Sequence, residues 1–214
     1  MNGNTLILWV TCQALIGANP SVSSVSQNGV TWKPAIQNND STTVDVEIWY
    51  GAVAAMGTPG TQLTITLTSG GGTSPLTIAD CSEFPGGLTL GQTQVNAPTV
   101  TGTSCVTGTT GATTVTQELS IGCIGAGSNI QGDVVQSQPL NNYNLGDGAE
   151  IFNGATLYGS LGCLYLVLAS IQTASSGTSF VGITAPAGCI ATFYAAPAVS
   201  TSQVYGDGLT SYTC

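Results

Sequence analysis

Alternation of apolar and polar residues over short segments most constrains the fold of this chain. The segment TTVDVEIWY at 42–50 places Val44, Val46 and Ile48 on one side and Asp45, Glu47 and Trp49 on the other. Successive side chains of a strand point to opposite faces, so one face is predicted to join a core and the other to meet water or a polar partner. QLTITLTS at 62–69 repeats the pattern with threonines outward. Helical periodicity is nearly absent, which predicts an all-β protein.

Runs rich in Val, Ile, Thr, Tyr and Trp recur between Gly, Asn, Ser and Pro residues, and these runs predict nine strands. The predicted strands are Thr5 to Cys12, Val30 to Ile36, Thr43 to Ala52, Gln62 to Thr68, Leu76 to Cys81, Thr114 to Ile124, Leu161 to Thr173, Ser179 to Thr184 and Cys189 to Ala195. The first of these is interrupted by polar residues and has no basic segment before it, so we expect a strand there and not a signal peptide.

Most strands have one apolar face, but LGCLYLVLASI at 161–171 is apolar on both. This indicates either a central strand covered on each side or an interface with another subunit. Glycine-rich stretches at 69–74 and 101–114 are expected to be loops within one domain, and 142–150 to be a long irregular surface loop.

The predicted fold is an antiparallel sandwich of two sheets, jelly-roll-like or Greek-key-like. Residues 1–197 are expected to form one β-sandwich domain, a length that suits a single all-β unit. Residues 198–214 form a C-terminal tail, expected either to add a strand to its own sandwich or to pair with a neighbouring subunit.

Charged residues make up only 5% of the chain, against about a quarter in ordinary soluble proteins. One lysine faces ten acidic residues, histidine is absent, and the formal net charge is −9. Without basic residues no counterion release can drive nucleic-acid binding, and anionic membranes repel the chain. No segment approaches the 18 to 20 apolar residues of a spanning helix, so we expect no membrane insertion.

Catalysis is not expected, because a chain without histidine cannot build a Ser-His-Asp or Cys-His system. A glycosidase with two carboxylates is the remaining enzymatic option, with Asp45 and Glu47 or Asp80 and Glu83 as the pair. The alternative is that these strand carboxylates only solubilise the surface. No cofactor is expected, and calcium is the one metal the composition leaves open, with Asn144, Asp147 and Glu150 as weak candidates. An ordinary turn explains the same residues.

Seven cysteines are spread along the chain without a CxxC motif, which argues against a metal cluster and favours an oxidising compartment. The alternative is that they are buried, reduced and simply apolar. We expect the pairs Cys163 with Cys189, Cys81 with Cys105, and Cys12 with Cys123. The odd cysteine is Cys214, either a tether to another chain or a frayed thiol.

Two features bear on sugars. Asn39-Asp40-Ser41 is the only N-glycosylation sequon, and a polar turn explains it equally well. Six strand aromatics could form a sugar-stacking platform, although core packing is their commoner role: Trp9, Trp32, Trp49, Tyr50, Tyr165 and Tyr194. Trp49 is notable because it shares a predicted face with Asp45 and Glu47.

The order of several segments resembles a β-sandwich module found in secreted bacterial and phage proteins. The segments are GNTLILWV, SVSSVSQNGVTWKPAIQ, VEIWYGAVA with QLTITLTS, CSEFPG, TTVTQELSIG and GCIATFYAAPA, which together span about residues 3–197. The resemblance implies a structural or binding role and names no site. The cysteines and the tail beyond residue 197 depart from it.

Together these patterns predict an extracellular or cell-surface structural protein that polymerises with itself through strand pairing and apolar contacts, strengthened by disulfides. The tail residues expected to take part are Val199, Val204, Tyr205, Tyr212 and Cys214. The alternative function is a carbohydrate-binding adhesin module or a decoration protein of a virion. The expected partners are copies of the chain itself and glycans.

Overall fold

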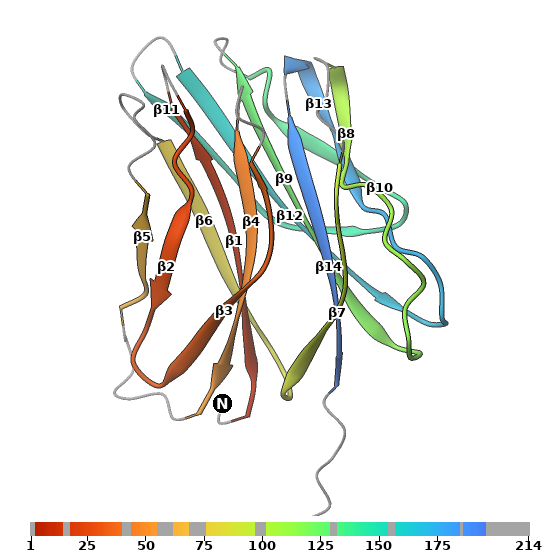
Figure 1. The fold of residues 1–214 in the computed structure, drawn as a ribbon. Helices are drawn as coiled ribbons and strands as arrows, with labels where there is room; N and C mark the ends of the chain where they lie inside the picture. The colour runs from red at the N-terminus through yellow and green to blue at the C-terminus, as the bar shows by residue number, and fades with distance from the viewer. Residues whose placement is uncertain are drawn as a thin grey trace, which may run out of the picture.

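The fold is all-β in the computed structural model, which describes residues 3–14, 18–39, 44–54, 62–68, 76–96, 102–128, 132–153, 157–184 and 186–195. Fourteen strands and no helix occur in these residues (Figure 1). The strands are β1 Thr5–Gln13, β2 Val22–Ser26, β3 Val30–Asn39, β4 Asp45–Val53, β5 Thr64–Leu67, β6 Leu76–Phe84, β7 Leu88–Val95, β8 Gly102–Val106, β9 Glu118–Ser128, β10 Gln136–Leu140, β11 Asn144–Asn153, β12 Leu157–Leu168, β13 Gly177–Thr184 and β14 Ala187–Ala195.

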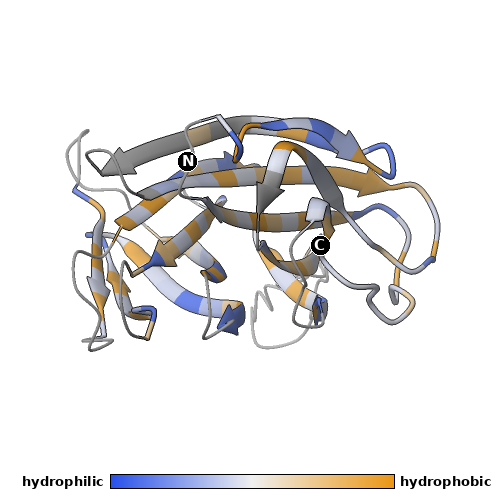
Figure 2. Cartoon of the chain, turned by 90° about the horizontal axis from the view of Figure 1, so that it is seen from above, coloured by the Kyte–Doolittle hydropathy of each residue, from blue (hydrophilic) through white to orange (hydrophobic). Residues whose placement is uncertain are grey.

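Two central sheets enclose the main core. One has the strand order β3-β4-β1-β6 and the other β11-β12-β9-β14-β7, and every ladder within them is antiparallel. Alternate residues of β1 and β4, such as Ile7 and Ile48, pack against Ile121 of β9 and Phe193 of β14. Figure 2 shows the strands in stacked layers, with hydrophobic residues recurring along the central strands.

Two smaller sheets cover the outer faces of the central pair. The β2-β5 sheet packs Val22 on Leu8, Val10 and Trp49 of the first central sheet. The β10-β13-β8 sheet packs Phe180 and Cys105 on the second. The described residues therefore form four sheets where the sequence predicted two, because both faces of β1 and much of β9 are apolar and each needs a cover.

All nine predicted strands are present with shifted boundaries, and the N-terminal segment is a strand as expected. Five strands were missed: β2, β7, β8, β10 and β11. The predicted loop at 142–150 is wrong, since most of it belongs to β11, and the glycine-rich stretch at 101–114 contains β8.

The two central sheets approach closely where glycine removes a side chain. A Cβ atom at Gly125 of β9 would collide with the side chains of Thr11 on β1 and Val46 on β4. Nearby, the Trp9 indole crosses the core and donates a hydrogen bond to the Gly122 carbonyl at 3.0 Å. This bond satisfies the one polar atom of a side chain that is only 2% exposed.

Candidate functional site

A cleft of about 370 Å³ opens along one side of the sandwich, between β6 of the first central sheet and β11 and β12 of the second. Its lining combines aromatic rings with carboxyl and hydroxyl groups. The lining residues are Trp9, Asp80, Ser82, Glu83, Phe84, Gly146, Cys163 and Tyr165. The volume lies within the range of about 300 to 1,000 Å³ that is usual for small-molecule sites.

Alternation along β6 carries polar residues into this cleft. Ile78 belongs to the main core, and Asp80, Ser82 and Phe84 follow it at two-residue steps on the same face. Asp80 lies opposite Trp9 in the ladder between β6 and β1. The Phe84 ring meets the Trp9 ring at a tilt of 57° with 6.4 Å between centroids. The aromatic pair therefore forms an apolar base beside the Asp80 carboxyl.

Glu83 borders the cleft, but alternation along β6 turns its side chain to the opposite face of the strand from Asp80 and Ser82. There the Asn4 side-chain amide donates to Glu83 Oε1 at 2.7 Å, and Asn4 Oδ1 accepts from the Gly86 amide at 3.1 Å. Because Asn4 precedes β1 and Gly86 follows β6, the same side chain fixes the turn and the Glu83 carboxylate together. Asp80 is therefore the carboxyl group that faces the cleft.

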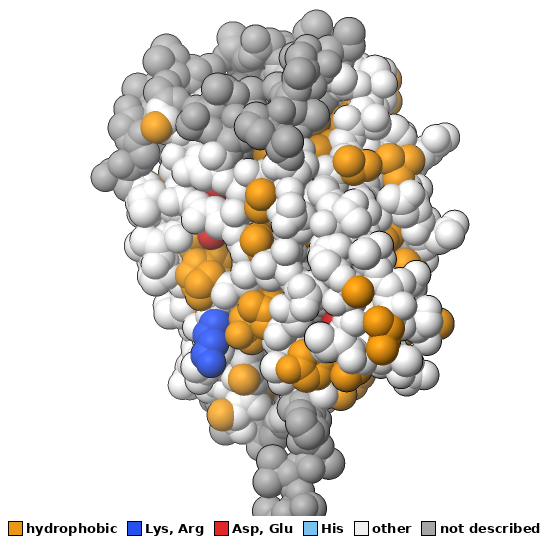
Figure 3. Space-filling view, turned by 45° about the vertical axis from the view of Figure 1, so that its right-hand side comes forward, with side chains coloured by type: hydrophobic (Ala, Val, Ile, Leu, Met, Phe, Trp, Pro, Cys, Tyr) orange, Lys and Arg blue, Asp and Glu red, His pale blue; other side chains and the backbone are white. Residues whose placement is uncertain are grey.

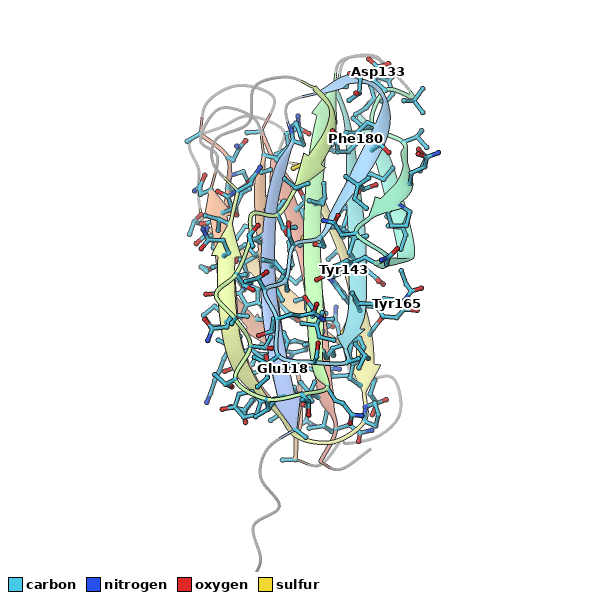
Figure 4. All side chains as sticks on the ribbon, turned by 90° about the vertical axis from the view of Figure 1, so that its right-hand side faces the viewer. Glu118, Asp133, Tyr143, Tyr165 and Phe180 are labelled. Atoms are coloured by element: carbon cyan, nitrogen blue, oxygen red, sulfur yellow. The ribbon has the colours of Figure 1, made fainter. Side chains whose placement is uncertain are left out.

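Tyr165 forms the opposite wall of the cleft from β12. Its side chain is 38% exposed, and Figure 4 shows it beside β12. A register shift in β11 between Leu145 and Gly148 places Gly146 beside this wall. A Cβ atom at Gly146 would lie 4.0 Å from the Tyr165 ring, so the backbone can approach the ring closely.

The chain supplies no positive charge to this cleft. Lys33, the one basic residue of the sequence, lies on β3, and β3 and β6 form opposite edges of the same sheet. The face in Figure 3 likewise shows a largely uncharged surface. Asp80 therefore presents hydrogen-bond acceptors that a ligand must match with donors.

The second half of β12 exposes apolar side chains beside the cleft. Residues 159–164 are buried, whereas Val167 is 60% exposed. Ile171 follows the strand at 57% exposure, and Val115, at 41%, lies on the segment that hydrogen-bonds alongside it through Thr113 and Gln172. We call Tyr165, Val167, Ile171 and Val115 the β12 apolar end. The first half of 161–171 is a covered central strand, as one sequence interpretation predicted. The second half exposes Tyr165, Val167 and Ile171, and an interface with another subunit there stays a prediction.

A shallower, uncharged pocket of about 540 Å³ lies next to the same stretch of chain. Leu166 and Leu168 meet Asn141, Asn142 and Ser175 there. Both asparagines have positive φ angles, 59° and 63°, and the Asn141 amide donates to the Ser175 carbonyl at 2.8 Å. The amides thus serve to hold a turn.

Asp45 and Glu47 form a buried carboxyl pair, contrary to the prediction that their face meets water. They are 0% and 2% exposed because the β2-β5 sheet covers them. Glu47 accepts hydrogen bonds from the Val22 amide and the Trp49 indole, both at 2.6 Å. Burial first, and then the hydrogen bond and charge of Glu47, raise the pKa of Asp45 to about 9, although the hydrogen bond from Gln37 acts to lower it. A substrate has no access to this pair.

The cysteines lie differently from the predicted pairs, and the structure has no disulfide among the six that it describes. Cys163, Cys123 and Cys189 occupy one row across β12, β9 and β14, with Cys123 opposite both others. Cys163 and Cys189 are thus two strands apart, about 9.6 Å, which exceeds the reach of a disulfide. Burial and then Cys189 raise the pKa of the Cys123 thiol.

The other two predicted pairs are also absent. Cys12 packs with Leu8 and Val10 on the outer face of the first sheet, whereas Cys123 lies in the main core. Burial raises the pKa of Cys12 to about 12. Cys81 is exposed on β6, and Cys105 is buried on β8 in a different sheet. Partial burial and then the charges of Asp80 and Glu83 raise the pKa of Cys81 to about 11.

The predicted aromatic platform is divided among four places. Trp9 and Tyr165 line the cleft, Trp32 and Trp49 pack under the β2-β5 sheet, and Tyr50 meets Phe193 edge-on in the core with 5.5 Å between centroids. Tyr194 is half-buried near the end of β14. Of the six aromatics, only Trp9 and Tyr165 line the cleft.

Several predicted residues remain without a described site. Asn39 is exposed at the end of β3, but the rest of its sequon lies outside the described residues. Asn144 lies on β11 together with Asp147 and Glu150, whose side chains the structure does not describe. The tail residues Val199, Val204, Tyr205, Tyr212 and Cys214 also lie outside the described part.

Within the described ranges, no cluster of three His, Cys, Asp or Glu side chains could hold a metal, and no helix has the length and hydropathy to cross a membrane. Three residues that line the cleft were not singled out from the sequence: Ser82, Phe84 and Gly146. The CSEFPG corner at 81–86 was the one sequence signal for Ser82 and Phe84. Comparison of the chain with protein-family models, curated proteins and solved structures finds no match.

Proposed function

We propose that this protein is a structural subunit that assembles with copies of itself at the outside of a cell. The observation that carries the proposal is the β12 apolar end, where Val167 and Ile171 remain 60% and 57% exposed although the same strand is buried a few residues earlier. Removing apolar surface from water contributes about 25 cal/mol per Å². Contiguous exposed apolar side chains therefore favour a partner surface.

A second copy of the chain is the partner that fits best. With one basic residue against ten acidic ones, two copies have few ion pairs to form with each other. Apolar contact and backbone hydrogen bonding are what remains. In the described residues, β3, β6, β7 and β11 end their sheets and each pairs with one neighbour. Such edges can accept a strand from another subunit, and the tail at 198–214 is our candidate donor.

The proposed location at the cell surface draws on the nearly uncharged surface and on the exposed Asn39, a candidate for glycosylation. Disulfides are not part of the support for this location. We further propose that the two central sheets follow a jelly-roll-like path to which the two outer sheets are additions. Assembly of such subunits would produce a filament or sheath through repeated contacts of one kind.

Substitution of Val167 by Asp tests the proposal. A charge at the centre of an apolar contact should lower self-association at least tenfold, since burying an unpaired carboxylate costs well over about 1.4 kcal/mol. Val181→Asp is the matched control, because Val181 is equally exposed, at 68%, but lies on β13 of an outer sheet. Sedimentation velocity and electron microscopy report the assembly state. A wild-type chain that stays monomeric, or equal loss in both variants, would overturn the proposal.

A further inference from the structure

We propose that the cleft between β6 and β12 binds a sugar, recognised by the Tyr165 ring, the Asp80 carboxyl group and the Ser82 hydroxyl group. Sugar binding and self-assembly would use different groups. Sugar binding depends on hydrogen-bond acceptors and the face of an aromatic ring, whereas assembly depends on the apolar side chains of Val167 and Ile171. Tyr165 borders both surfaces.

The aromatic side of the cleft suits the apolar face of a pyranose. Tyr165 offers an exposed ring on β12, and Phe84 and Trp9 offer a second apolar surface on β6 and β1. Trp9 is only 2% exposed and its indole N–H already bonds to Gly122, so it contributes shape at the base and no hydrogen bond. Aromatic rings contribute contact area with little loss of side-chain freedom.

The polar side suits hydroxyl groups. Asp80 accepts hydrogen bonds and Ser82 can donate or accept, which matches a ligand with neighbouring O–H donors. A purely apolar ligand would leave the Asp80 carboxylate desolvated without a partner, and this selects against it.

Charge then ranks the sugars. The Asp80 carboxylate has no basic partner, since Lys33 lies at the opposite edge of the sheet. A hexosamine with a free ammonium group should bind most tightly, a neutral hexose should bind less tightly, and a uronic acid should be repelled. This order differs from the one expected for an aromatic surface alone, which would not discriminate by charge.

Titration calorimetry with three disaccharides, one of free hexosamines, one of neutral hexoses and one of uronic acids, tests the inference on the full chain. We expect the stated order. Both Asp80→Asn and Tyr165→Ala should weaken hexosamine binding about tenfold or more. Asp133→Asn and Tyr194→Ala are matched controls away from the cleft and should leave binding unchanged. Thermal unfolding of each variant establishes that it is folded.

Three results would overturn the inference: no binding of any of the three at millimolar concentration, equal binding of hexosamine and uronic acid, or cleft variants that bind as the wild type does. Failure of the assembly proposal can be distinguished from failure of the sugar-binding inference. Val167→Asp should abolish assembly and leave hexosamine affinity within about twofold, because the residue is absent from the cleft lining. Asp80→Asn should weaken hexosamine binding and leave assembly unchanged.

Discussion

Asp45 and Glu47 illustrate how one added layer changes the chemistry of a residue. Their alternation with Val44, Val46 and Ile48 correctly places them on the opposite face of β4 from the main core. What the alternation could not reveal is the β2-β5 sheet, whose Val22 amide reaches Glu47. A carboxylate that would be ordinary on the surface thus becomes an acceptor for backbone and indole donors. Asp45 beside it keeps its proton.

Replacement of Asp45 by Asn should flatten the pH dependence of stability. The folded pKa of Asp45 is about 9 and the ordinary value is 3.8, so the folded chain binds more protons between these values. The contribution of Asp45 to the free energy of unfolding is then fully present below about pH 4 and is lost as pH rises through about 9, by at most about 1.4 kcal/mol per pH unit. Asn cannot titrate, and its amide can still donate to Glu47. Urea unfolding at several pH values measures the slope.

Gln37 provides the opposing variant. Its amide donates to both Asp45 oxygens, at 3.3 and 3.4 Å, and lowers the pKa of Asp45. Gln37→Ala should raise the pKa of Asp45, so the fall in stability should continue to higher pH than in the wild type. Asp45→Asn should remove that fall, because Asn does not titrate. A slope unchanged by both substitutions would mean that Asp45 is ionised in the folded chain.

The β2-β5 sheet is attached to the central sandwich by apolar packing and by Glu47. Val22 and Ile65 cover Leu8, Val10 and Trp49, and the Glu47 carboxyl links β2 to β4 through the Val22 amide. Burying a carboxyl group under so small a sheet is unfavourable unless its oxygens are paired. Both oxygens are paired here, which explains how a two-stranded sheet can remain in place.

Trp49→Phe should lower the free energy of unfolding by about 1.5 to 3 kcal/mol more than Trp32→Phe. Both substitutions remove an indole from the same apolar cluster. Trp49 also donates to Glu47 Oε2 at 2.6 Å, whereas Trp32 Nε1 is buried with no hydrogen-bond partner among the described residues. Chemical denaturation of the two variants gives the difference directly. Equal losses would mean that the indole bond to Glu47 contributes nothing.

The strands missed by the sequence share a position at the periphery. β7 and β11 end the second central sheet, and β2, β8 and β10 belong to the outer sheets. Such strands bury less apolar surface, so sequences such as VSSVS and QSQPL carry a weak periodic signal. The sequence predicted individual residues of the cleft but not the cleft itself. Asp80, Glu83, Trp9 and Tyr165 were each noted, but their meeting depends on β6 pairing with β1 and packing beside β12, and sequence spacing does not specify that.

On the scale of the whole molecule, the four layers leave few charges to interact across the surface. β1 is buried along its entire length and β9 along most of its own, so the outer sheets cover both faces of the sandwich. Lys33 is the only basic residue, and the exposed large apolar side chains lie on β8, β12, β13 and the adjoining loops. Contacts between copies must then be apolar or made by the backbone. Charge can oppose such contacts but cannot supply them.

Self-association should therefore strengthen as salt is added. Each copy has a formal charge of −9, and like charges repel over about 30 Å at 0.01 M ionic strength but only about 8 Å at 0.15 M. Screening removes this repulsion and leaves the contact at Val167 and Ile171 intact. Lowering the pH toward the isoelectric point near 4.1 should act in the same direction. Average mass from sedimentation equilibrium, followed across a salt series, measures the effect. Val167→Asp should remove the salt-induced association, and association that weakens with salt in the wild type would show that ion pairs hold the copies together.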